Sequence, residues 1–298
     1  MASLIGQNLI LFHQSNLNTK KKEIYLTYFA PLIMGKKEKN DVAREHPFQA
    51  VFLLDVTSSP FTPLTSETSL GLCPLANRTL LETTFEFFIR NDITELYLIC
   101  QNNHEEIEKY VNSQDWHMKI TILKMGPTLS LGDCLRELDK ERVIRSDPFL
   151  LLSGYIVSNL ILKTYIEKHK ARKKKDSLAI MTMFLKQKPK TWGLQPVHSD
   201  LIIACNTNNQ QMVLYDNNPN DSECTISTVC YNEHSSITFH ADVVDCYLDL
   251  CSPEVLVTFS DNFDYVDLRK HFVHNEVHNY ELGNHIFAEI IIDEVIEY

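Results

Sequence analysis

The chain has 298 residues, of which 44% are hydrophobic and 22% are charged. This length and composition are enough for one sizeable hydrophobic core. The chain could form one large α/β domain or two smaller domains, and we expect a single domain. The 28 basic and 39 acidic residues leave a formal net charge of −11, which argues against a protein dedicated to nucleic acid because such a protein must neutralise many phosphates.

We expect residues 1–47 to form a flexible N-terminal extension. Two apolar runs lie within the first 35 residues, but both are short and are separated by Lys20, Lys21 and Lys22. Neither run approaches the roughly 20 apolar residues that a membrane-spanning helix needs. The charged segment follows the first apolar run instead of preceding it, which is not the pattern of a secretory signal.

From Phe48 onwards, strand-like and helix-like segments alternate, which is typical of a sheet of parallel strands covered by helices. We expect Ser158 to cap the start of a long helix at 159–175, which ends in a basic run. Ser130 is expected to cap the start of the preceding helix, at 130–141. The sequence predicts strands at 48–56, 95–100, 117–125, 148–154 and 177–185, and helices at 78–90, 104–112, 130–141 and 159–175.

The C-terminal part continues the α/β pattern. A hairpin is predicted across Asn206–Gln210, and residues 216–236, rich in Asn, Asp, Ser and Glu, are predicted to be a loop insertion. A strand at 241–251, a helix that starts near Pro253 and a last strand at 283–293 follow. We therefore predict one domain from residue 48 to residue 298.

Neither the cysteines nor the histidines indicate a metal site. The eight cysteines form no CxxC pair, which favours reduced thiols in a cytosolic protein. His271, His274 and His278 would share one helix face, but the glutamate of an HExxH motif is absent, so a solvated face is favoured over a metal site. The basic run Lys168–Lys175 complements the dipole of its helix, and a docking patch for RNA or an acidic partner is the alternative left open.

Three short segments near the C-terminal end occur in a distinctive order. Asp245 and Cys246 come first, CSPEV follows at 251–255, and DNFDY follows at 261–265. In this order they resemble the nucleotidyltransferase-like domain of the epsilon subunits of eukaryotic translation initiation factor 2B, over the range from Gln49 to Glu289. The resemblance implies a Rossmann-like, three-layer αβα fold with a mixed, mostly parallel sheet of the nucleotidyltransferase (nucleotide-diphospho-sugar transferase) type.

The resemblance also implies a function through protein contacts. Epsilon subunits belong to a heteromeric complex that exchanges GDP for GTP on initiation factor 2, and in that complex this domain packs against the gamma subunit. The implied partners are the gamma-like and other subunits of initiation factor 2B and GDP-bound initiation factor 2, with no cofactor, no membrane and no specific nucleic acid. The functional Asn-Phe pair of the family matches Asn262 and Phe263. The alternative from the residues themselves is that Phe263 and Tyr265 pack between the flanking helices while Asn262 caps one of them.

The nucleotide site of active relatives is altered in this chain. Active sugar-nucleotide pyrophosphorylases carry a glycine-rich loop with an arginine after the first strand, then a lysine, and an aspartate after the fourth strand that binds the metal. Here Thr57, Ser58 and Ser59 replace the glycines, no lysine lies between Pro63 and Arg78, and Tyr155 stands at the position of the aspartate. We therefore expect a degenerate site without catalysis, and an active sugar-phosphate nucleotidyltransferase is the alternative.

Epsilon subunits continue, beyond the position that matches Tyr298, into a β-helix and a helical-repeat domain that carries the exchange activity. The chain is thus interpreted either as a fragment or as a short paralogue that binds without exchange, and the sequence does not decide between these. In both cases the chain itself is not expected to be an enzyme.

Overall fold

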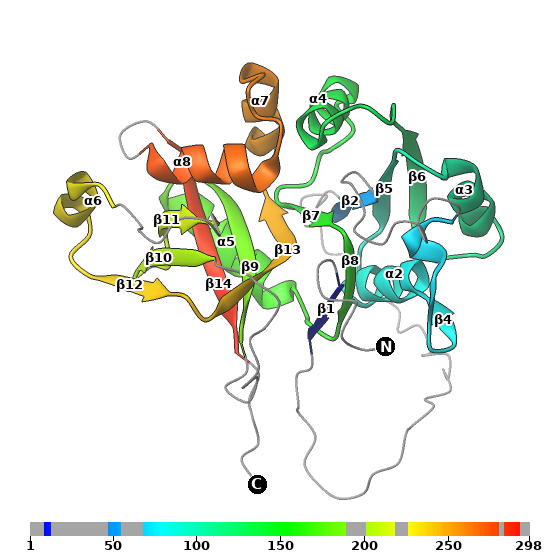
Figure 1. Ribbon diagram of the computed structural model, residues 1–298, viewed down its shortest axis with the longest axis horizontal. Coiled ribbons are helices and arrows are strands. Elements are labelled where there is room, and N and C mark those ends of the chain that lie inside the picture. Colours follow the sequence, from blue (N-terminus) through cyan, green and yellow to red (C-terminus); the bar gives the residue numbers. More distant parts are fainter. Residues whose placement is uncertain are drawn as a thin grey trace, which may run out of the picture.

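The computed structural model describes residues 9–12, 47–54, 68–188, 201–217, 226–279 and 283–292. Its centre is a seven-stranded mixed sheet (Figure 1). Along the sheet the strands are β14 (His285–Ile291), β9 (Ala179–Gln187), β13 (Val243–Cys251), β7 (Phe149–Ser153), β2 (Gln49–Leu54), β5 (Glu95–Cys100) and β6 (Lys119–Lys124). Strand β13 is antiparallel to both of its neighbours, whereas the other pairings are parallel. The predicted mixed, mostly parallel sheet is confirmed.

Helices cover both faces of this sheet. One face packs against α2 (Leu80–Arg90), α3 (His104–Asn112) and α5 (Lys163–Lys175). The other face packs against α4 (Leu131–Glu141), α7 (Glu254–Asp261), the π-helical segment η2 (Leu268–Val273) and α8 (His274–His278). Strand β2 shows why its sequence is continuously apolar: Phe52 points into the first layer and Val51 and Leu53 into the second, and all of its residues are buried. The predicted three-layer αβα arrangement is confirmed.

A smaller antiparallel sheet lies beside β14. Its strands are β11 (Met212–Asp216), β10 (Ile202–Asn206) and β12 (Ile237–His240). The predicted hairpin across Asn206–Gln210 is confirmed by the pairing of β10 with β11. Residues 216–236, predicted to be a loop, contain helix α6 (Thr228–Glu233), and the side chain of Ser227 accepts a hydrogen bond from the backbone of Val229 at its start. Cys230 and Val213 pack together in a small core that stabilises this short helix.

The prediction that Ser158 caps a long helix is wrong. Ser158 ends strand β8 (Tyr155–Ser158), and α5 begins only at Lys163. The side chain of Asn91 explains the difference, because its Oδ1 accepts from the Leu162 amide at 2.7 Å and its Nδ2 donates to the Leu160 carbonyl at 3.0 Å. A side chain distant in sequence thus holds residues 160–162 out of the helix.

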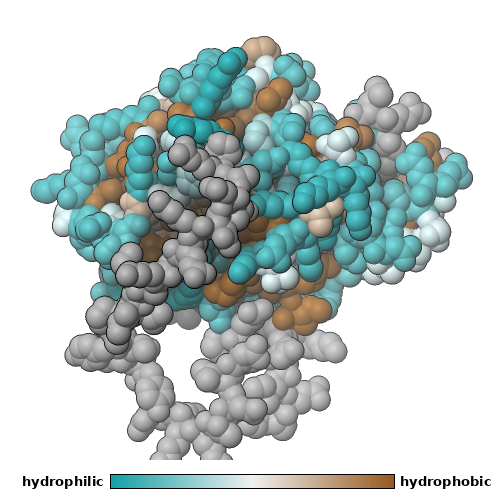
Figure 2. Space-filling model, turned by 180° about the vertical axis from the view of Figure 1, so that it is seen from behind, coloured by the Kyte–Doolittle hydropathy of each residue, from teal (hydrophilic) through white to brown (hydrophobic). Residues whose placement is uncertain are grey.

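Short elements complete the described structure. Strand β1 (Leu9–Phe12) pairs in parallel with β8, and the other residues of the predicted N-terminal extension up to His46 lie outside the described residues. Strands β3 (Pro74–Leu75) and β4 (Arg78–Thr79) form a small hairpin after the 3-10 turn η1 (Leu70–Leu72). Within the described ranges, no helix has the length and apolarity needed to cross a membrane. Seen from behind, the visible surface is mostly hydrophilic, with apolar residues in smaller patches (Figure 2).

A buried cluster of charges joins η2 to the sheet. The guanidinium of Arg269 donates to Asp245 at 2.5 and 2.9 Å and to Asp249 at 2.9 and 3.0 Å. Tyr215 also donates to Asp245, at 3.3 Å. Burial raises the pKa of Asp249 to about 7. The charge of Asp245 acts in the same direction, whereas Arg269, the one cation facing both carboxylates, opposes the shift.

Helix α5 is held by a second polar network. His169 is buried, with Nδ1 2.9 Å from the Thr182 hydroxyl and Nε2 3.1 Å from the Ser252 hydroxyl, which itself donates to Asp147. Burial lowers the pKa of His169 to about 4, so the ring is neutral at physiological pH.

Part of the basic run of α5 is neutralised within the molecule. Lys168 and Arg172 pair with Glu289, and Lys173 pairs with Asp147 and Glu254. These contacts tie the C-terminal end of α5 to β14 and α7. The possible role of the run as a docking patch stays a prediction.

Candidate functional site

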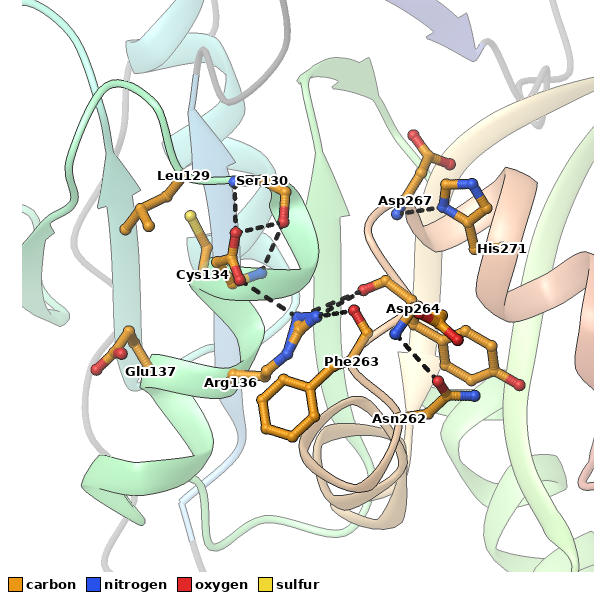
Figure 3. A network of polar contacts seen from close by, with 12 residues as sticks. Leu129, Ser130, Cys134, Arg136, Glu137, Asn262, Phe263, Asp264, Asp267 and His271 are labelled. Carbon is orange, nitrogen blue, oxygen red and sulfur yellow. Dashed lines mark hydrogen bonds and ion pairs between the residues drawn. The ribbon is translucent and has the colours of Figure 1, made fainter.

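Phe263 and Tyr265 lie in one turn after α7 but differ in burial. Figure 3 shows the turn, with Phe263 beside Arg136 of α4. The backbone amide of Asn262 closes α7 by donating to the Thr258 carbonyl, and its Oδ1 accepts from the Asp264 amide at 3.1 Å. This Asx-type hydrogen bond fixes the turn. The Phe263 residue is 75% exposed, whereas Tyr265 is 6% exposed.

Tyr265 anchors the turn in the core. Its ring packs edge-on against Phe259 and Phe272, and its hydroxyl donates to Glu276 at 2.8 Å. Burial and the nearby carboxylate raise the pKa of Tyr265 to about 12. The proposed packing of both aromatic residues between helices therefore holds for Tyr265 and is wrong for Phe263.

Arg136 of α4 clamps the turn from the other side. Its Nη2 donates to the Phe263 carbonyl at 2.8 Å and to the Tyr265 carbonyl at 3.3 Å. The guanidinium carbon also lies 5.3 Å from the centre of the Phe263 ring, within the range of a cation–π contact. Arg136 thus fixes the backbone of Phe263 and supports one side of its ring, and the rest of the ring faces solvent.

Gly132 allows α4 to approach the turn closely. Its amide donates to the Val266 carbonyl at 3.0 Å, and a Cβ atom at this position would lie 1.9 Å from the Tyr265 carbonyl oxygen. Any side chain would therefore meet backbone atoms. Sequence reasoning missed both Gly132 and Arg136, although a glycine in the first turn of a helix was a signal for such a close approach.

Tyr155, predicted to replace a metal-binding aspartate, lies inside the protein. Its ring packs edge-on against Phe52 with 5.6 Å between the ring centres. The phenol lies against Gly71, where a Cβ atom would be 2.8 Å from the hydroxyl oxygen. Thr57, Ser58 and Ser59, the other residues of the predicted degenerate nucleotide site, lie outside the described residues. Their relation to Tyr155 therefore stays a prediction.

The three histidines near the C-terminal end do not act as one group. The rings of His274 and His278 stack at 4.2 Å, whereas His271 accepts a hydrogen bond from the Asp267 amide. Over the described parts of the chain, no three His, Cys, Asp or Glu side chains are grouped so that they could hold a metal ion. Burial raises the pKa of Cys134 to about 11 and that of Cys205 to about 12, so these thiols act as small apolar side chains.

The sequence of the chain is similar to those of known proteins. A model of the nucleotidyl transferase family matches residues 57–205, half of the chain. The chain is 36% identical over 245 residues to translation initiation factor eIF2B subunit epsilon of Dictyostelium discoideum, which covers 81% of this chain and 34% of that protein. It is 32% identical over 262 residues to the subunit of the same name from Schizosaccharomyces pombe, covering 86% and 38%. The chain thus spans about a third of the length of the curated relatives that it matches, and the predicted resemblance is confirmed.

Solved structures share the fold. HddC from Yersinia pseudotuberculosis superimposes with a TM-score of 0.57 at 10% identity, over 82% of this chain and 90% of HddC. CMP:2-keto-3-deoxy-manno-octonic acid synthetase, solved in complex with CTP, superimposes with a TM-score of 0.54 at 10% identity, over 83% and 90%. At such identities the likeness shows the fold alone. The match of the family model over half of the residues shows that the chain belongs to the nucleotidyl transferase family.

Proposed function

We propose that residues 48–298 form a single protein-binding module of the kind found in the epsilon subunit of initiation factor 2B. In this proposal the module works in the cytosol, within the complex that exchanges GDP for GTP on initiation factor 2. Its partners are a gamma-like subunit, the other subunits of the complex and GDP-bound initiation factor 2. The similarity to two epsilon subunits supports this assignment.

One observation carries the binding role: Phe263 is 75% exposed although the turn that holds it is fixed by Asn262 and Arg136. A large aromatic side chain held rigidly in solvent is the typical anchor of a protein interface, because little conformational freedom is lost on binding. We propose that Asn262 and Phe263 contact initiation factor 2, with Asn262 supplying both a donor and an acceptor.

We further propose that the module does not transfer nucleotides and needs no cofactor. Tyr155 supports this, since its phenol is packed against Phe52 and Gly71 and a neutral phenol does not hold Mg²⁺ as a carboxylate does. The competing function is an active sugar-phosphate nucleotidyltransferase, which membership of the family favours. The two functions differ in metal-dependent release of pyrophosphate from a nucleoside triphosphate and a sugar phosphate, which we expect to be absent in the wild type and in Tyr155→Asp.

The binding role is tested with Phe263→Ala and a matched control, Phe239→Ala. Phe239 is also exposed, at 52%, and lies on β12, away from α4 and α7 (Figure 1). Phe263→Ala is expected to weaken binding of GDP-loaded initiation factor 2 by about 1 to 4 kcal/mol, while the cation–π contact limits the loss of stability to about 1 kcal/mol.

Binding is measured by titration of the purified chain, and stability by urea unfolding of the same samples. Phe239→Ala should bind like the wild type. A Phe263→Ala variant with unchanged affinity, or an equal loss in both variants, would reject the assignment of Phe263.

A further inference from the structure

Helix α5 ends in unpaired positive charge that leads into an exposed turn. Lys174 and Lys175, the last two residues of the helix, are exposed, and within the described ranges neither takes part in an ion pair. The members of the run that pair with carboxylates of other elements are Lys168, Arg172 and Lys173. Free cations therefore remain where the helix meets the turn.

Ser177 and Leu178 form this turn, between α5 and β9. Both residues are exposed, Leu178 at 46%. The side chain of Asp176 accepts a hydrogen bond from the Leu178 amide at 3.0 Å, and the Leu178 carbonyl accepts from the His285 amide at 2.7 Å. These bonds fix the backbone of the turn, whereas no described residue forms a hydrogen bond with the Ser177 hydroxyl. The hydroxyl is therefore available for reaction.

We propose that Ser177 is a phosphorylation site for a basophilic protein kinase, a kinase that selects basic residues before the serine. Such kinases bind their substrates in an extended conformation, with acidic pockets for cations two and three residues before the serine and an apolar pocket for the residue after it. Lys174 and Lys175 occupy the two cationic positions, and Leu178 occupies the apolar position. This covalent modification does not depend on the proposed function.

The reaction is a phosphoryl transfer from ATP. The Ser177 hydroxyl oxygen attacks the γ-phosphorus, the bond from this phosphorus to the oxygen that bridges to the β-phosphate breaks, and ADP leaves. The hydroxyl proton passes to the catalytic aspartate of the kinase. The new phosphate carries a charge of about −1.5 to −2 at pH 7, which offsets the two positive charges of Lys174 and Lys175. Phosphorylation therefore brings the free end of the basic run close to neutral.

The segment can reach a kinase while the rest of the fold stays closed. Lys173 is held by Asp147 and Glu254, so α5 is anchored up to this residue. Beyond it, an extended conformation requires the end of the helix to fray and the ion pair between Asp176 and His285 to open. Helix ends fray readily, and a partly exposed pair adds little stability. We therefore expect the folded chain to be a substrate.

Ser146 provides a contrast within the same chain. It also follows basic residues, Arg142 and Arg145, but it is 4% exposed and its hydroxyl accepts a hydrogen bond from the Gln49 amide. A kinase that acts on the folded chain cannot reach this hydroxyl. Basic residues and exposure thus coincide at Ser177 and not at Ser146.

The test incubates the purified chain with ATP and the catalytic subunit of cyclic-AMP-dependent protein kinase, a basophilic enzyme. Initial rates give kcat/KM, and mass spectrometry identifies the modified residue. Ser177→Ala removes the acceptor, and Lys174→Ala/Lys175→Ala removes the two cations beside it. The matched control is Lys163→Ala/Lys170→Ala, which makes the same change of charge at exposed positions of α5 farther from the turn. Thermal melts verify that all variants are folded.

We expect phosphate on Ser177 of the wild type, none on Ser146, and a loss of this product in Ser177→Ala. The Lys174→Ala/Lys175→Ala variant should lower kcat/KM by about 10- to 100-fold, because each lost charge-assisted contact weakens binding by about tenfold. The control should stay within about twofold of the wild type, since its lysines lie outside the kinase pockets. If no phosphate forms on Ser177, or if both lysine variants lose the same fraction of the rate, the proposal is overturned.

Discussion

Replacing Gly132 by alanine would test the contact between α4 and the turn that presents Phe263. The new Cβ atom would lie 1.9 Å from the Tyr265 carbonyl oxygen and 3.0 Å from its carbon. To reach an ordinary carbon–oxygen separation of about 3.3 Å, the two backbones must part by on the order of 1 Å. This movement also strains the hydrogen bond from Gly132 to Val266 and those from Arg136 to the turn.

The expected loss for Gly132→Ala is about 1 to 4 kcal/mol of the free energy of unfolding. Overpacking contributes about 1 to 3 kcal/mol, and weakened hydrogen bonds about 1 to 2 kcal/mol. The higher helix propensity of alanine offsets about 1 kcal/mol of this loss of stability.

Urea unfolding measures this loss, and Gly126→Ala is the matched control. A Cβ atom at Gly126 would meet its nearest neighbour, Leu129, at 3.7 Å, which is an ordinary contact, so the control should be nearly neutral. If Gly132→Ala were as stable as the control, the close approach of α4 to the turn would be refuted.

Three further variants test buried charges and a cap. Asp249→Asn should remove a pH dependence: the folded pKa of Asp249 is raised from 3.8 to about 7, so the stability that its proton provides is lost as pH rises towards 7. The slope of the urea midpoint between pH 4 and 7 should therefore become more positive than in the wild type, and an unchanged slope would contradict this. His169→Gln should make the free energy of unfolding less sensitive to acid. The folded pKa of His169 is lowered from 6.5 to about 4, so its contribution to stability is lost as pH falls through this window. An acid sensitivity equal to that of the wild type would count against this prediction. Ser130→Ala removes a capping box and should cost about 1 kcal/mol in urea unfolding, whereas a neutral result would show that the cap is compensated.

Local patterns in the sequence predicted most of the elements. The segments ELYLIC and HEEIEKYVN match β5 and α3 residue for residue, because a continuous apolar run and a helical repeat are each set by neighbouring residues. The cap at Ser130 was found for the same reason. The start of α5 was not, because it depends on Asn91, 71 residues before Leu162. Such distant hydrogen bonds leave no local pattern.

The candidate site shows the same limit. The resemblance singled out Asn262 and Phe263, but DNFDY does not reveal which of its aromatic residues is exposed. That choice depends on Arg136, which is 127 residues from Phe263 in the sequence and donates to its carbonyl, and on Glu276, which accepts from the Tyr265 hydroxyl. Only the packing of α4 and α8 around the turn determines it.

The antiparallel strand β13 has a consequence for how the chain reaches its fold. Strands β7, β2, β5 and β6 come from residues 49–153, whereas β9 and β14 come from later in the chain, and β13 joins these two groups. While the protein is being synthesised, the facing edges of β7 and β9 have no partner until residues 243–251 have left the ribosome. Unpaired strand edges invite pairing with other chains. Strand β13 therefore joins the two parts of the sheet late in synthesis, and a nascent chain arrested before Val243 should be the species that most needs a chaperone.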